Sequence, residues 1–145
     1  MEDNYYDYTF NITLVGDCGV GKTNIGSMFV DNEFISDHWF TLGVLIKNKI
    51  IKLDNSIIKL KILCTSSNEE FRSESLMHYI RGGQCIFVVF DLTKLETFTN
   101  IHIWLHEIKK YNDDIQFIDE NIDENINDYI NDYTIDDYII KNNDL

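Results

Sequence analysis

The feature of this sequence that most constrains its fold is a glycine-rich segment near the N-terminus. Residues 16–23 read Gly-Asp-Cys-Gly-Val-Gly-Lys-Thr, which fits the pattern G-x-x-x-x-G-K-[ST]. The β-branched and aromatic run 9–15 before it predicts a strand, and a helix is expected over 22–31. Glycines in such a place let backbone N–H groups turn inward around phosphate oxygens, helped by the N-terminus of the helix. The segment therefore predicts a phosphate-binding loop (P-loop).

The side chains of this loop indicate separate roles. The Lys22 ammonium would bridge the β- and γ-phosphates of a nucleoside triphosphate, and the Thr23 hydroxyl would ligate Mg²⁺. A chance match to the pattern is expected in roughly 1% of chains of this length or fewer, so we favour phosphate binding. The residues expected to contact nucleotide here are Gly16, Asp17, Cys18, Gly19, Val20, Gly21, Lys22, Thr23 and Asn24.

The order of the other expected elements predicts an α/β fold with a mostly parallel sheet. The runs 42–53 and 57–64, joined by the turn residues 54–56, predict a hairpin. The uninterrupted apolar run 85–92 is typical of a parallel strand covered on both faces. One helix is expected to begin at a capping box formed by Thr93 and Glu96. Its apolar stripe would comprise Phe98, Ile101, Trp104, Leu105, Ile108 and Tyr111.

The charge is divided unevenly along the chain. Of 25 acidic and 12 basic residues, 11 acidic and one basic lie in 112–145, where the formal net charge is −10 of the total −13. This balance argues against nucleic-acid binding. Residues 119–133 approximate a four-residue repeat of Asp, Glu, Asn, Ile and Tyr, a composition that favours disorder over a stable helix. The sequence thus predicts one domain over 1–112 and an acidic low-complexity tail over 113–145.

The cysteines and the hydropathy pattern indicate a cytoplasmic protein. The three cysteines, Cys18, Cys64 and Cys85, are odd in number and widely spaced, so no disulfide framework is expected. No apolar run approaches the length of a membrane span, and the acidic start of the chain is unlike a signal peptide.

Several motifs together make the chain resemble a Ras-superfamily small GTPase of the Rab type over roughly residues 5–112. The resemblance implies a P-loop NTPase fold with a Ras-like G domain, which binds GTP or GDP with Mg²⁺ and acts with Rab effectors or regulators in vesicle trafficking. It also places Phe34 where the family stacks an aromatic ring on the guanine, and Thr41 where switch I binds Mg²⁺ and the γ-phosphate. Besides 16–23, the motifs are Tyr6-Asp7-Tyr8, Thr41-Leu42-Gly43-Val44, Lys59-Leu60-Lys61-Ile62, Glu69-x-Phe71-Arg72-Ser73, Tyr79-x-Arg81-Gly82, Phe90-Asp91-Leu92-Thr93 and Trp104-Leu105-x-Glu107-Ile108.

The chain departs from the family at switch II. Residues 64–68 read Cys-Thr-Ser-Ser-Asn where the family has Asp-Thr-Ala-Gly-Gln. Cys64 replaces the carboxylate that holds a Mg²⁺-bound water, and Ser67 replaces the glycine whose N–H meets the γ-phosphate. Asn68, at the catalytic position, is one methylene shorter than the glutamine that orients the attacking water. We therefore expect impaired hydrolysis.

A second departure concerns the C-terminal third. The family motif Asn-Lys-x-Asp, which reads the guanine base, and the motif Ser-Ala-Lys have no counterpart here. We expect an incomplete domain that is monomeric or dependent on a partner, with weak selectivity for guanine. Without a C-terminal cysteine, no prenyl anchor and no stable membrane anchoring are expected. Two alternatives stay open: a pseudo-GTPase that serves only as an interaction module or is a non-functional product, and an unrelated P-loop enzyme such as a small kinase.

Overall fold

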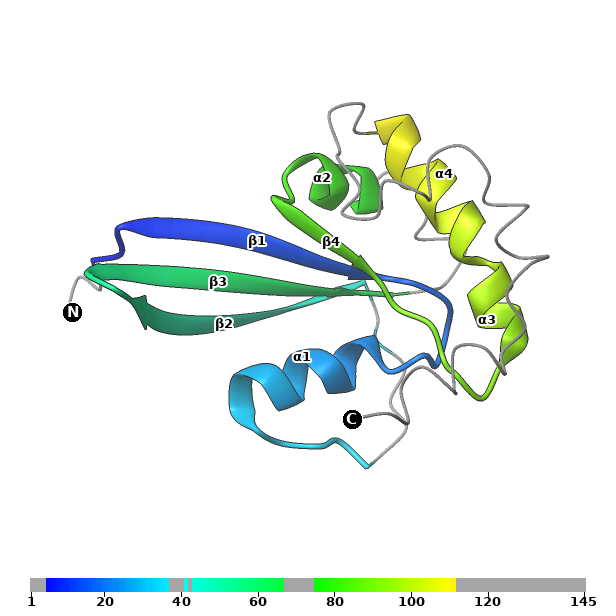
Figure 1. Ribbon diagram of the computed structural model, residues 1–145, viewed down its shortest axis with the longest axis horizontal. Coiled ribbons are helices and arrows are strands. Elements are labelled where there is room, and N and C mark those ends of the chain that lie inside the picture. The colour runs from blue at the N-terminus through cyan, green and yellow to red at the C-terminus, as the bar shows by residue number, and fades with distance from the viewer. Residues whose placement is uncertain (1–4, 37–40, 42, 67–74, 112–145) are drawn as a thin grey trace.

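The computed structural model describes residues 5–36, 41, 43–66 and 75–111, and within them an α/β fold (Figure 1). The described strands form one sheet in the order β2-β3-β1-β4. β1 is parallel to both β3 and β4, while β2 is antiparallel to β3. The expected α/β fold with a mostly parallel sheet is confirmed. The elements are β1 (Tyr8–Val15), α1 (Lys22–Asp31), β2 (Val44–Leu53), β3 (Ser56–Thr65), α2 (Ser75–Arg81), β4 (Cys85–Val88), α3 (Leu95–Thr99) and α4 (Ile101–Tyr111).

Helices cover both faces of the sheet, so side chains that alternate along β1 enter different cores (Figure 1). On the α1 face, Leu14 packs with Ile62 and Cys64. On the opposite face, Val15 packs in a second cluster whose other buried members come from α2 and α4, namely Ile80, Trp104 and Ile108. β1 is therefore held between the two cores, and the loop that follows Val15 starts from a rigid position.

The expected hairpin is present with a tighter turn than the sequence suggested. Leu53 pairs with Ser56, so only Asp54 and Asn55 lie in the turn, and Ser56 is the first residue of β3 rather than part of the turn. Asp54 has a φ of 52°, a left-handed conformation that aspartate tolerates in turns.

β4 is shorter than the strand expected over 85–92. It ends at Val88, and the following Val89 N–H still donates to the Val15 carbonyl oxygen (2.8 Å) before the chain leaves the sheet. In the described part of the sheet β4 is an edge strand, and Phe87 is 52% exposed. Coverage of both faces is thus wrong for Phe87, which pairs with Leu14 and leaves half of its side chain exposed.

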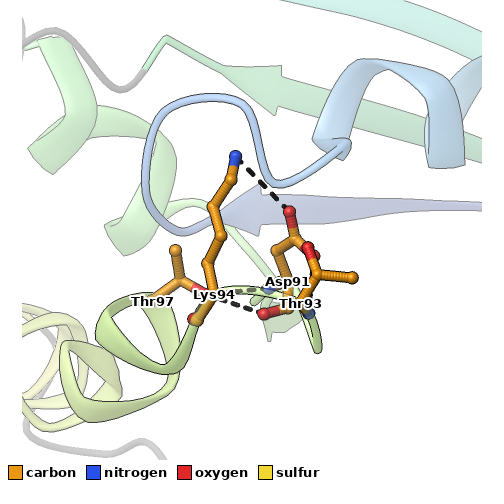
Figure 2. Close-up of polar contacts among 4 residues, drawn as sticks. All are labelled: Asp91, Thr93, Lys94 and Thr97. Carbon is orange, nitrogen blue, oxygen red and sulfur yellow. Dashed lines mark hydrogen bonds and ion pairs between the residues drawn. The ribbon is translucent and has the colours of Figure 1, made fainter.

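The capping box expected at Thr93 is wrong, because Asp91 organises this turn instead. The Asp91 Oδ1 atom accepts from the backbone N–H (2.9 Å) and the hydroxyl (2.7 Å) of Thr93 (Figure 2). These hydrogen bonds hold the pKa of Asp91 below its ordinary value. The Thr97 hydroxyl donates to the Lys94 carbonyl oxygen (2.8 Å), and α3 begins at Leu95 without a side-chain cap.

The single helix expected after the turn is two helices, α3 and α4, separated by Asn100. The Asn100 N–H donates to the Glu96 carbonyl oxygen (2.9 Å), which closes α3, while the Asn100 carbonyl accepts from the Trp104 N–H (3.3 Å) at the start of α4. Asparagine competes well for such terminal positions and poorly for helix interiors. The break turns the Asn100 side chain toward the loop after β1.

Candidate functional site

The loop 16–21 joins β1 to α1 and has the backbone conformation of a tight cradle. Gly16 has a φ of 137°, and a Cβ atom there would lie 2.1 Å from the Val89 carbonyl oxygen, so only glycine fits against the end of β4. Gly21, with a φ of 93°, is the N-cap residue of α1, and no side chain caps that helix. A helix N-terminus of this kind attracts anions through its N–H groups and its dipole. The loop 16–21 is therefore a candidate phosphate site, shaped by its glycines and by the contact of Gly16 with the chain after β4.

Lys22, the first residue of α1, lies inside this loop and is only 5% exposed. Its Nζ atom donates to the backbone carbonyl oxygens of Gly16 (2.8 Å) and Asp17 (2.7 Å). Burial lowers the pKa of Lys22 to about 8, a shift that nearby Cys18 and Asp17 oppose. Because burial disfavours the charged form of this ammonium, an anion beside Nζ would favour that form and raise the pKa again.

The two hydroxyls expected to ligate Mg²⁺ meet, although they lie on different segments. Thr23 Oγ1 and Thr41 Oγ1 are 2.6 Å apart. Mg²⁺ binds oxygen ligands at about 2.0–2.1 Å in octahedral geometry, which places adjacent ligand oxygens about 3 Å apart. A small outward shift of the two hydroxyls would fit them to neighbouring positions around one ion. The donor set is therefore chemically and geometrically suited to Mg²⁺.

Asn24 connects the start of α1 with the segment that carries Phe34. Its Oδ1 atom accepts from the Ile35 N–H (3.0 Å), so this side chain fixes a neighbouring loop. Phe34 is 67% exposed, which leaves its ring face accessible to a planar ligand. The segment that carries Phe34 is thus tied, through Asn24, to the helix that begins with Lys22.

The other loop residues differ in exposure. Val20 is buried, whereas Cys18 is exposed and carries a free thiol. The Lys94 ammonium would lie 3.9 Å from a Cβ at Gly19, so a second cation borders the loop. Lys94 also lies 3.5 Å from Asp91 Oδ2, an exposed contact that partly offsets its charge (Figure 2).

Cys64, the position where the resemblance implies a carboxylate, is fully buried at the end of β3. It packs with Leu14 and Ile62, and burial raises the pKa of its thiol. The neighbouring Thr65 hydroxyl donates to the Leu14 carbonyl oxygen (2.8 Å). Cys64 is therefore part of the core under α1. Ser67 and Asn68 lie outside the described residues.

The Asp17 carboxylate is bound on the outer side of the loop by two residues that the sequence did not mark as functional. Its Oδ1 atom accepts from the Trp104 indole N–H (2.8 Å), and its Oδ2 atom accepts from the Asn100 amide (2.7 Å). The sequence signal that indicates such a contact is Trp104 itself, because a buried indole N–H needs an acceptor.

Within the described residues, no group of three or more His, Cys, Asp or Glu side chains is arranged to hold a metal ion. The described cysteines Cys18, Cys64 and Cys85 are free, as expected. Among the described helices, none combines the length and the apolar character that crossing a bilayer requires.

Comparison with known proteins places these features in a family context. The model of the Ras family matches residues 11–133. The chain is 38% identical over 113 residues to Ras-related protein RABA1b of Arabidopsis thaliana, covering 78% of this chain and 51% of that protein. It is 38% identical over 111 residues to Ras-related protein Rab11C of Lotus japonicus, covering 77% and 51%. It is 38% identical over 109 residues to GTP-binding protein YPTM2 of Zea mays, covering 75% and 53%. The chain spans about half the length of the curated relatives it matches.

Proposed function

This chain belongs to the Ras family and is a small GTPase of the Rab type, and from that membership we propose that it binds GTP and GDP with Mg²⁺ as a switch in vesicle trafficking. Rab effectors and regulators would be its protein partners. A relative similar over three quarters of this chain is named a GTP-binding protein, which supports the nucleotide class.

The observation that carries the proposal is the contact between Thr23 and Thr41. Thr23 is fixed at the start of α1, and Thr41 comes from the segment that precedes β2. Two hydroxyls 2.6 Å apart and a buried lysine would supply two of the six ligands of Mg²⁺ and a cation for the phosphates. When bound, the ion neutralises charge on the β- and γ-phosphates, and Thr23 and Thr41 would hold it.

Different residues of this chain would bind the phosphates and the base. The loop after β1 presents backbone N–H groups at the N-terminus of α1, and the Lys22 ammonium supplies a fixed positive charge. Phe34 offers an exposed aromatic face for the base. Stacking and phosphate contacts distinguish guanine from adenine weakly, whereas paired polar contacts to a base edge discriminate by 10⁴-fold or more.

The test of this proposal is to purify the protein, denature it, and identify any released nucleotide by chromatography. We expect GDP or GTP.

The selectivity for the base is measured by competition titrations at fixed Mg²⁺. The affinities for ATP and GTP should differ by no more than about tenfold, because no base-reading motif is present in the sequence. Protein that neither retains nor takes up guanine nucleotide would instead support the alternative of a pseudo-GTPase that acts as an interaction module. A preference for GTP of a hundredfold or more would contradict the weak selectivity.

Hydrolysis of bound GTP is expected to be very slow and to respond little to a GTPase-activating protein. An arginine finger acts only where the attacking water is positioned and the switch is ordered. In this sequence Ser67 replaces the glycine that meets the γ-phosphate, and Asn68 replaces the glutamine that orients the water. Displacements on the order of 1 Å are enough to lower such rates strongly. Single-turnover assays at saturating nucleotide measure the rate, with the double variant Ser67→Gly, Asn68→Gln as the comparison, which should be faster. A wild-type rate equal to that of the double variant would contradict this prediction.

A further inference from the structure

The contact between Asp17 and the junction of α3 and α4 joins two parts of the chain that are far apart in sequence. Asn100 and Trp104 lie 83 and 87 positions after Asp17, and each donates one hydrogen bond to its carboxylate, at 2.7 and 2.8 Å. Hydrogen bonds to a charged acceptor are about twice as strong as neutral ones. A partly buried carboxylate that satisfies two separate donors holds this side of the loop in one place.

The junction is itself rigid. Trp104 is 3% exposed and packs in the cluster with Val15, Ile80 and Ile108. Asn100 is fixed by backbone hydrogen bonds to both helices, and its carbonyl accepts from the Trp104 N–H. The carboxylate also lies at the N-terminus of α4, where the helix dipole favours negative charge. Asp17 is thus attached to the core rather than to another surface loop.

The inner side of Asp17 contacts the candidate phosphate site. Its backbone carbonyl accepts from Lys22 Nζ (2.7 Å), next to the bond from the same atom to the Gly16 carbonyl. Asp17 therefore contacts Lys22 through its main chain, while its side chain is attached to the core through Asn100 and Trp104. Rotation of the Asp17 peptide would misplace the Lys22 ammonium and change the path of the loop at Cys18.

We propose that Asp17, Asn100 and Trp104 form a loop clamp, which positions the phosphate-binding loop and the Lys22 ammonium for nucleotide. These are positioning residues that act through the loop backbone. The inference rests on the proposed function and deepens it, because the clamp predicts which residues remote from the phosphates control how long nucleotide stays bound.

The test compares Asp17→Ala with Asp17→Asn. The alanine removes both acceptors, whereas the asparagine oxygen still accepts from Trp104 and its NH₂ group meets Asn100 once that amide turns over. We expect Asp17→Ala to speed dissociation of fluorescent GDP about 10- to 100-fold, and Asp17→Asn to stay within about threefold of wild type. Asp31→Ala is the matched control, since Asp31 pairs with Lys47 at the far end of α1. Wild-type dissociation in Asp17→Ala, or equal loss in both Asp17 variants, would overturn the clamp.

A readout without nucleotide separates this inference from the proposed function. Amide hydrogen exchange should accelerate at residues 18–23 in Asp17→Ala while amides of the β2–β3 hairpin keep their wild-type rates, and the Trp104 indole N–H resonance should shift. A uniform acceleration across the hairpin would mean general loss of stability and would overturn a positioning role. If wild-type protein binds no guanine nucleotide, the proposed function fails, and the clamp is then judged on the exchange rates alone.

Discussion

Replacing Lys22 with alanine is expected to weaken Mg²⁺-nucleotide binding at least about 100-fold, because the change removes the buried charge that we propose to face the phosphates. It also removes the two hydrogen bonds that hold the Gly16 and Asp17 carbonyls, so the loop loses its inner support. Titration of fluorescent GDP and GTP at fixed Mg²⁺ measures the effect. Lys52→Ala, a change at an exposed lysine on β2, should leave the affinity unchanged.

The pH dependence of binding is a second readout of the same assignment. Burial lowers the pKa of Lys22 to about 8 in the nucleotide-free protein. A phosphate beside Nζ favours the charged form and raises that pKa, so affinity is full below about pH 8 and decreases above it. Lys22→Ala should abolish this decrease. Unaltered affinity in Lys22→Ala would show that the phosphate site lies elsewhere.

Replacing Gly26 with alanine is expected to destabilise the protein by about 1–2 kcal/mol, although alanine normally stabilises a helix interior relative to glycine by about 1 kcal/mol. A Cβ atom at Gly26 would lie 2.5 Å from Cys64 Sγ and 3.6 Å from Ile62 Cγ2. Cys64 is fully buried, so its sulfur has no room to retreat. The clash therefore outweighs the gain in helix propensity.

The partner variant Cys64→Ala makes this prediction specific to the Gly26–Cys64 contact. Without the sulfur, the same Gly26→Ala change should become neutral or stabilising by up to about 1 kcal/mol. Urea denaturation of wild type, both single variants and the double variant measures the coupling. If Gly26→Ala stabilises the wild-type background, α1 lies farther from β3 than the structure indicates.

Local sequence signals predicted the elements that depend on local chemistry. The helix over 22–31 was predicted with the bounds that α1 has. In the structure Gly21 precedes it, and Asn32, with a φ of 56°, ends it. The hairpin was also predicted, since the turn residues 54–56 separate two strand-like runs, although Ser56 proved to belong to β3. The expectation for Lys22 in the loop used only the spacing of the motif.

Contacts between remote segments were not predictable in the same way. Asp17 was grouped with the nucleotide contacts, and nothing near it in sequence indicates Asn100 or Trp104 as partners. The sequence predicted Thr93 as a helix cap. In the structure both its hydroxyl and its N–H donate to the Asp91 carboxylate instead. The packing of Cys64 depends on α1 lying across β3, which only the tertiary structure reveals.

The strand pairing has a consequence for the order of folding. The β2–β3 hairpin closes across two residues, whereas β1 joins the sheet only when Tyr8 meets Ile58 and Ile12 meets Cys85. Parallel pairing of this kind requires long loops to close before any contact compensates the lost chain entropy, so it comes late in folding. The loop after Val15 follows the end of β1, where those pairings meet, and we therefore expect it to form late in folding. A ligand of that loop stabilises the native state more than the folding transition state, so it lengthens the lifetime of the folded protein without speeding its formation.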